Sequence, residues 1–250
     1  IEYSVDSQLV YCAGAVNMQV SVLYTAALSA GADSTFSAST DALIYTFTKD
    51  GQFVNNITYL GGSNEDVAIG LALSRSFVYV SGYTTSSDFP ITKLSNGGYP
   101  AFDSVYHGGN DGFIAVFSPS LDTLLYCSYL GGDGSDKALT VRAIADSVFC
   151  ISLASQDTLP ETGPDYTVNF ADSIFDGNSE AWIGKFSSFN QLAFGTYIGG
   201  NNDDLVNDFQ LLSDGSIVFA GSTRNITEVN ETIPDNTTGQ EALFGKIRVP

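Results

Sequence analysis

The stretch TYLGG at Thr58–Gly62 returns as SYLGG at 128–132 and as TYIGG at 196–200. Its tyrosines, Tyr59, Tyr129 and Tyr197, are separated by 70 and 68 residues. One phrase at nearly even intervals indicates an internal structural repeat. The spacing divides the chain into four units of about 1–57, 58–127, 128–195 and 196–250.

Each unit contains four short runs typical of β-strands, with turn residues between them. In the second unit they are about Val67–Leu73, Phe77–Ser81, Gly112–Phe117 and Thr123–Leu130. The first run alternates large residues (Val67, Ile69, Leu71, Leu73) with small ones (Ala68, Gly70, Ala72). Successive side chains of a strand point to opposite faces, so this strand is expected to be buried on both sides.

Repeated four-stranded sheets, each covered by its neighbours, predict an all-β fold, a β-propeller built of antiparallel blades. The glycine pair of the phrase is expected to turn the chain from the outer strand of one blade into the inner strand of the next. The tyrosine before it is expected to pack at the rim of its blade.

The second unit resembles a known family in the segments YLGG…D…A, VYVSGYTTSSDFP and DGFIAVFSPSLDTLLYCSYLGG. These are similar to the SBBP repeat, a β-propeller repeat found largely in secreted and cell-surface proteins. The resemblance covers most of the chain and weakens from the second unit to the third, and then to the first and fourth. It implies a propeller and a secreted or surface setting, and it carries no catalytic residues.

The ends and the first loop depart from this pattern. The chain starts at an inner strand and stops after a third one, so we expect either a longer chain with a larger propeller or a neighbouring molecule that supplies the missing edge. The first unit carries the apolar stretch MQVSVLYTAALSAG at 18–31, where the second has a polar turn. This stretch is interpreted as an extra strand or tucked loop, or alternatively as a patch that binds a partner.

The charge balance excludes some partners. Nine basic and 28 acidic residues give a net charge of −19, which disfavours nucleic acid because phosphate binding needs clustered Lys and Arg. No apolar run approaches the roughly 20 residues that span a bilayer, so membrane insertion is not expected. Other protein chains, including copies of this one, are the expected partners.

Four N-x-S/T sequons predict N-linked glycans and an extracellular or cell-surface location. They begin at Asn56, Asn225, Asn230 and Asn236. Alternatively, these residues only reflect turns rich in Asn and Thr. The three cysteines, Cys12, Cys127 and Cys150, lie in apolar runs, which favours buried free thiols; one disulfide of undetermined connectivity is the alternative.

Aspartates recur four residues after each glycine pair, at Asp66, Asp136 and Asp204. Asp-rich loops can bind Ca²⁺, which takes six to eight oxygen ligands. The surrounding spacing is not that of a dedicated calcium loop, so hydrogen bonding within each turn is the other interpretation. Ca²⁺ is the one cofactor that the sequence suggests.

Polar residues interrupt the predicted inner strands of the third and fourth units, at Arg142, Asn207, Asp208 and Gln210. An arginine beside an aspartate at a channel wall can recognise a carboxylate or a sugar. An internal ion pair or a polar channel wall is the alternative.

The sequence suggests no catalytic residue. His107, the single histidine, lies in a Gly-rich loop, and the chain has no nucleophile elbow, zinc motif or phosphate-binding loop. We therefore expect a non-enzymatic structural or adhesive module of an extracellular matrix or filament, acting through blade edges and loops. The alternatives are a propeller that binds carbohydrate or a small ligand, and a glycan-active enzyme with two catalytic carboxylates.

Overall fold

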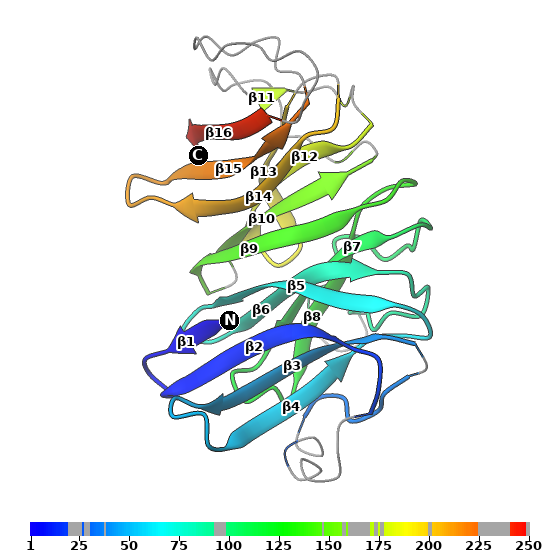
Figure 1. The fold of residues 1–250 in the computed structure, drawn as a ribbon, viewed down its shortest axis with the longest axis vertical. Coiled ribbons are helices and arrows are strands. Elements are labelled where there is room, and N and C mark those ends of the chain that lie inside the picture. Colours follow the sequence, from blue (N-terminus) through cyan, green and yellow to red (C-terminus); the bar gives the residue numbers. More distant parts are fainter. Residues whose placement is uncertain are drawn as a thin grey trace.

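The chain forms four antiparallel sheets that follow one another along the sequence (Figure 1). The computed structural model describes residues 1–19, 27, 31–37, 39–92, 99–146, 148–156, 159, 171–172, 175, 178–199, 202–224 and 241–248. The all-β prediction is confirmed over these residues. No helix among them is long and apolar enough to cross a membrane.

Sheets 1 and 2 have four strands each, paired in sequence order. Sheet 1 contains β1 (Glu2–Ser4), β2 (Leu9–Val16), β3 (Asp41–Thr48) and β4 (Val54–Leu60). Sheet 2 contains β5 (Asp66–Leu73), β6 (Val78–Thr84), β7 (Asp111–Phe117) and β8 (Leu124–Leu130). The four strands expected in the second unit are therefore confirmed within a few residues.

Sheets 3 and 4 depart from four strands. Sheet 3 contains β9 (Lys137–Ala145), β10 (Val148–Ser155), β12 (Glu180–Ser188) and β13 (Gln191–Ile198), with the two-residue strand β11 (Ala171–Asp172) added beside β13. Sheet 4 contains β14 (Leu205–Leu211), β15 (Ser216–Thr223) and β16 (Glu241–Arg248). Among the described strands, β16 pairs with β15 alone and sheet 4 has no fourth strand.

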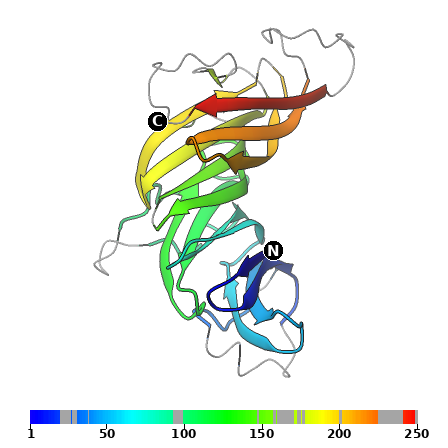
Figure 2. The ribbon, with the colours of Figure 1, turned by 90° about the vertical axis from the view of Figure 1, so that its left-hand side faces the viewer.

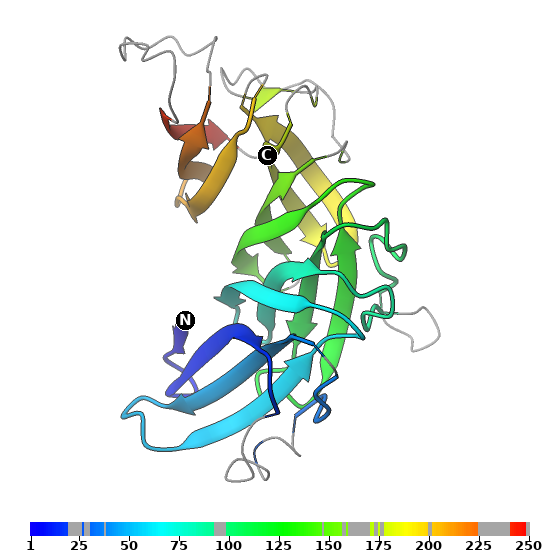
Figure 3. The same cartoon turned by 45° about the vertical axis from the view of Figure 1, so that its right-hand side comes forward.

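The sheets pack face to face in a row, with sheet 1 and sheet 4 at opposite ends (Figures 1 and 2). Neighbouring sheets approach through their first strands, since β5 contacts β9, and β9 contacts β14. The row curves, and the N-terminus lies on its concave side (Figure 3). Among the described strands, the main contacts of each sheet are therefore with the sheets next to it in the sequence.

Apolar side chains fill the three spaces between sheets. Ile44 of sheet 1 shares a buried cluster with Leu71 of sheet 2, and Ile114 of sheet 2 shares one with Val141 of sheet 3. Ile183 of sheet 3 packs in a third cluster with Phe209 of sheet 4. Each isoleucine is fully buried, which stabilises the fold by roughly 1.5–3 kcal/mol per side chain.

The first strand of sheet 2 is buried on both sides, as predicted, but the predicted assignment of its faces is wrong. A β-bulge between Ala68 and Gly70 leaves Ile69 out of register and 44% exposed. Ala68 and Leu71 therefore share the face toward sheet 1, while Ala72 lies in the cluster with sheet 3. Similar bulges occur in two other first strands. The register of β9 with β10 shifts between Ser152 and Leu153, and the register of β14 with β15 shifts between Val206 and Asp208.

The repeated phrase closes each of the first three sheets instead of opening the next. Tyr59, Tyr129 and Tyr197 lie in the fourth strands β4, β8 and β13, and the glycine pair follows before the next first strand. The predicted connection between sheets is confirmed, and the sheets begin a few residues later than the units drawn from the sequence. The tyrosines are at most 1% exposed, so they belong to the core and not to an open rim.

Glycines at one repeated position allow a test of how closely neighbouring strands approach within a sheet. Gly82 and Gly14 face Phe113 and Leu43, the third residues of β7 and β3. A Cβ on Gly82 would lie 1.9 Å from the Val67 carbonyl oxygen, whereas a Cβ on Gly14 would meet nothing within 4 Å.

We expect Gly82→Ala to lower the free energy of unfolding by roughly 1–3 kcal/mol or more, because the backbone must shift to accept the methyl group. The matched change Gly14→Ala should stay within about 0.5 kcal/mol of the unchanged protein. Urea denaturation measures both. Equal effects of the two changes would contradict the close approach of β5 to β6 at Gly82.

Candidate functional site

Two acidic residues are buried at each boundary between sheets. One is the first residue of a third strand, and the other lies at or just before the first strand of the next sheet. The pairs, here called junctions 1, 2 and 3, are Asp41 with Asp66, Asp111 with Asp136, and Glu180 with Asp204. All six residues are at most 2% exposed.

Junction 1 surrounds a glycine with carboxyl groups. Asp66 Oδ2 accepts hydrogen bonds from the Gly62 amide at 2.7 Å and from Ser86 Oγ at 3.0 Å. Asp41 accepts from the amide and the hydroxyl of Ser37 at 2.9 and 2.6 Å. A Cβ on Gly61 would lie 2.7 Å from the Asp66 carboxyl and 2.9 Å from that of Asp41. Both acids thus lie against the same glycine, and any larger residue would collide with them.

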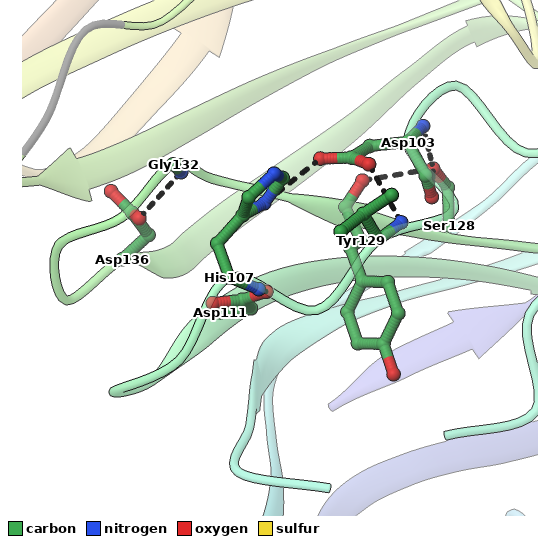
Figure 4. Close-up of polar contacts among 8 residues, drawn as sticks. Asp103, His107, Asp111, Ser128, Tyr129, Gly132 and Asp136 are labelled. Atoms are coloured by element: carbon green, nitrogen blue, oxygen red, sulfur yellow. Dashed lines mark hydrogen bonds and ion pairs between the residues drawn. The ribbon is translucent and has the colours of Figure 1, made fainter. Parts of the chain in front are cut away.

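Junction 2 repeats this geometry in the middle of the molecule (Figure 4). Asp111 Oδ2 accepts from the His107 amide at 2.9 Å, and Asp136 Oδ2 accepts from the Gly132 amide at 3.0 Å. Asp111 Oδ1 is buried and has no hydrogen-bond partner among the described residues. The His107 Nδ1 lies 3.5 Å from a carboxyl oxygen of Asp103.

Burial makes two of these carboxyl groups, those of Asp66 and Asp111, hold their protons more tightly. Loss of hydration raises the pKa of Asp66 to about 6, although its three hydrogen bonds oppose the shift and the nearby Asp41 adds to it. Burial likewise raises the pKa of Asp111 to about 6, with smaller contributions from the charges of Asp136 and Asp103. Both groups therefore change protonation near pH 6.

One backbone hydrogen bond crosses each boundary at the same place. The amides of Asp66, Asp136 and Asp204 donate to the carbonyl oxygens of Thr40, Asn110 and Ser179 at 2.7, 2.6 and 2.7 Å. Each acceptor residue directly precedes the acid that begins a third strand. The acid pair therefore lies where one sheet is tied to the next by its main chain.

A second repeated motif, which the sequence analysis missed, positions the acids. The segments DSTFSASTD (33–41), DSVYHGGND (103–111) and DSIFDGNSE (172–180) share the pattern D-S-x-[FY]-x₄-[DE]. Its aromatic residue covers the buried tyrosine of the same sheet, with ring centroids 5.8–6.0 Å apart, in the pairs Phe36–Tyr59, Tyr106–Tyr129 and Phe175–Tyr197. The constant spacing was the signal that could have revealed it.

The first aspartate of this motif brings the loop to the fourth strand. The Asp33 and Asp103 carbonyl oxygens accept the amides of Tyr59 and Tyr129 at 3.0 and 3.2 Å. In sheet 3 the same place is taken by strand β11, whose Asp172 pairs with Tyr197. In sheets 1, 2 and 3 this loop thus runs along the outer edge of the sheet, and in sheet 3 it forms the short strand β11.

The three aspartates suggested for calcium lie in three separate junctions. Asp66 and Asp136 accept amide hydrogen bonds within their own turns, as the other interpretation expected. Within the described residues, no three His, Cys, Asp or Glu side chains are grouped so that they could hold a metal ion. Calcium at Asp66, Asp136 or Asp204 stays a prediction.

Two of the suggested channel residues form an ion pair. Arg142 of β9 and Asp208 of β14 approach to 2.5 Å, and the guanidinium lies 5.8 Å from the ring centroid of Phe209. Asn207 accepts a hydrogen bond at its carbonyl oxygen from Thr140 Oγ1, and Gln210 is exposed on the same strand. The ion pair agrees with the structural alternative, and ligand binding by these residues stays a prediction.

A polar depression of about 410 Å³ opens over junction 1. Its lining combines carboxylates, hydroxyls and two glycines: Asp33, Thr35, Ser37, Gly61, Gly62, Ser63 and Asp88. Hydrogen bonds from the amide and hydroxyl of Ser63 lower the pKa of Asp88, so this carboxylate is ionised at neutral pH. The depression offers acceptors and hydroxyls to a polar ligand.

Of the sequons, only the first lies in the described residues. Asn56 is half-buried in the edge strand β4, and Thr58, the threonine of the same sequon, is fully buried. Asn225, Asn230 and Asn236 lie outside the described residues. Cys12 and Cys127 are buried free thiols, as expected, and the side chain of Cys150 is outside the description.

Asp111 provides a test of the protonated junction. Its pKa is 3.8 without the fold and about 6 within it, so the folded state binds the proton more tightly. The free energy of unfolding should therefore fall as pH rises from about 4 to about 6. Asp111→Asn, which mimics the protonated acid, should raise the free energy of unfolding at pH 7 by about 1–3 kcal/mol and leave it nearly unchanged near pH 4.

Asp122→Asn, in the turn between β7 and β8, is the matched control. Hydrogen bonds from Ser118 and Thr123 lower the pKa of this exposed carboxyl, so its replacement should bring no gain at pH 7. Urea denaturation at several pH values measures both variants. A loss of stability at pH 7 in Asp111→Asn would show that the ionised form is the one the junction favours.

The chain matches no family model and no curated protein.

Proposed function

We propose that this chain is an arc of propeller blades that serves as a non-enzymatic structural or adhesive module of an extracellular assembly. It would act through protein–protein contacts made by its end sheets, strand edges and loops. The observation that carries the proposal is the open row: sheets 1 and 4 lie at opposite ends, and β16 has a partner on one side alone among the described strands. An unpaired strand edge is a ready surface for a strand of another chain.

The row is built to keep its shape. Each boundary combines an apolar cluster, a backbone hydrogen bond and a buried acid pair. Interactions of three kinds at each boundary limit bending between neighbouring sheets. A stiff, extended unit supports a role in a matrix or filament, where separated contact sites must hold a fixed geometry.

The surface supports an extracellular setting. The net charge of −19 keeps the chain soluble by mutual repulsion, and Asn56 lies on an edge strand where its side chain is partly accessible. The four sequons and the resemblance to the SBBP repeat support the same proposal.

The proposal is tested on native material from its source. Intact mass with and without glycosidase should give a mass above 26.5 kDa that falls on treatment. Cross-linking mass spectrometry of the extracellular fraction should join residues of sheet 1 or sheet 4 to other chains. A bare 26.5 kDa monomer with no cross-linked partner would overturn the proposal.

One observation favours a second function, the binding of a carbohydrate or small polar ligand. The depression over junction 1 places Asp33 and Asp88 near several hydroxyl groups. If it binds a sugar, a glycan array should give saturable binding that Asp88→Ala weakens at least roughly tenfold, since a charge-assisted hydrogen bond is lost. The exposed Asp122→Ala, in sheet 2, is the control; equal signals from both variants would contradict this function.

A further inference from the structure

The outer face of sheet 1 has the residue pattern of a face that packs on another sheet. In sheet 2 the face toward sheet 1 carries Phe113 and Tyr129, which lie opposite each other and are at most 1% exposed. Leu43 and Tyr59 form the same pair in sheet 1, and Ile57 lies on the same face of β4. Among the described strands no sheet packs on this side, yet Ile57 and Tyr59 are 3% and 1% exposed. Something other than a sheet therefore covers them.

The chain itself covers this face. Among the described residues outside the strands of sheet 1, Ala27 and Phe36 belong to the cluster that contains Ile57 and Tyr59. The centroid of the Phe36 ring lies 5.8 Å from that of the Tyr59 ring. Ala27 and residues 31–37 thus lie where a neighbouring sheet packs in sheet 2, and we call them the cap.

The cap follows the edge of β4 and reaches sheet 2. The Tyr59 amide donates to the Asp33 carbonyl oxygen at 3.0 Å, and the Ala32 amide donates to the Leu121 carbonyl oxygen at 2.8 Å. Leu121 lies in the turn between β7 and β8. A Cβ on Gly31 would lie 2.0 Å from a carbonyl oxygen of β4, so the main chain of the cap touches that strand. These contacts hold the cap on sheet 1.

The last residue of the second strand shows that sheet 1 lacks a junction of its own with a preceding sheet. Thr84, Ser155 and Thr223 have this place in sheets 2, 3 and 4. The Thr84 hydroxyl donates to Asp66, the acid that lies at the boundary between sheets 1 and 2. Val16 has the same place in sheet 1 and packs in the apolar cluster under the cap. Sheet 1 therefore has no hydroxyl donor where the other sheets have one for an acid at their boundary.

The turn between the third and fourth strands differs in the same sense. Leu121 of sheet 2 has a φ of 58°, which is uncommon for a residue other than glycine, and its side chain is fully buried in the cluster shared with sheet 1. Phe189 of sheet 3 is 6% exposed and packs on Phe77 and Tyr126 of sheet 2. Sheet 1 has Gly51 in this turn, where a Cβ would meet nothing within 4 Å. Sheets 2 and 3 thus reach the sheet before them with an apolar turn residue, and sheet 1 has none there.

We propose that sheet 1 is a built-in end cap of the row, which closes its own outer face so that no further sheet, of this chain or of another, packs on it. Arrays of repeated units require terminal units of this kind, because an uncovered apolar face at the end of a row would associate. The features that carry the proposal lie within sheet 1 and the cap, and they do not depend on where the chain begins.

The inference rests on the proposed function, because it specifies what the arc offers to a partner at this end. Sheet 1 then makes contacts through its loops and strand edges and not through the face of the sheet. The arc also cannot close into a ring by packing another sheet on this face. The closed end gives the row a direction.

Two matched variants of the purified full chain test the cap. Phe36→Ala should uncover Tyr59, whose amide is expected to exchange its hydrogen roughly tenfold faster or more, and association in analytical ultracentrifugation should rise above that of the unchanged chain. Tyr106→Ala removes the equivalent ring over Tyr129 in sheet 2, where sheet 1 still covers the face, so association should not rise. Equal association of the two variants would overturn the cap.

Gly31→Val is a second, stronger variant, since its side chain cannot fit against β4 and should lift the cap. Gly14→Ala, in the same sheet and in open space, is its control. Circular dichroism checks that each variant is folded. If Gly31→Val folds and changes neither the exchange of the Tyr59 amide nor association, the inference is wrong.

A benzoylphenylalanine in place of Tyr45, in the cluster under the cap, tests the face without removing any part of the cap. Photo-crosslinks are expected within one chain, to the region of Ala27 and Phe36, and crosslinks from this position to another chain would overturn the proposal. Native material that is a bare monomer would overturn the proposed function and leave the cap standing. Loss of the cap in these variants without any effect would do the reverse.

Discussion

Three backbone hydrogen bonds, one across each boundary between sheets, set the geometry on which the rest of the molecule depends. The amides of Asp66, Asp136 and Asp204 reach the carbonyl that precedes each third strand. This bond brings the start of one sheet against the preceding sheet and carries the aspartate side chain into the interior. The glycine before it must then lack a side chain, because the acid occupies that space at Gly61, Gly131 and Gly199.

Burying two acids together is costly unless hydrogen bonds or protons compensate. The junctions use both means: amide and hydroxyl donors surround Asp66, and the pKa of Asp66 and Asp111 is raised to about 6. The interior and the surface therefore respond to pH in the same direction. A lower pH protonates Asp66 and Asp111 and also reduces the repulsion that follows from a net charge of −19.

A row of similar sheets has nearest-neighbour energetics, and its two ends differ from its middle. Sheets 2 and 3 each have a neighbouring sheet packed on both of their faces. At one end, the aromatic residue Phe36 covers part of sheet 1 by packing on Tyr59. At the other end, Phe244 remains exposed. The end sheets, and not the middle of the row, are therefore where this molecule has surface to share.

The residue pattern by itself determined the all-β class, the four strands of the second unit and the connections between sheets, because apolar alternation and the spacing of the tyrosine phrase are local signals. The residue pattern also suggested an ion pair between Arg142 and Asp208, as the alternative to ligand binding by these residues. The pattern could not show the bulge at Ile69, since a single extra residue changes which face each neighbour occupies without changing the composition of the strand. Nor could it show that Asp41 and Asp66 converge on Gly61, because residues 25 positions apart meet only when one sheet packs on the next. Tertiary packing alone decided which apolar residues are buried: Ile114 and Phe244 occupy the same place in the repeat, and among the described strands only Ile114 has a further sheet beside it.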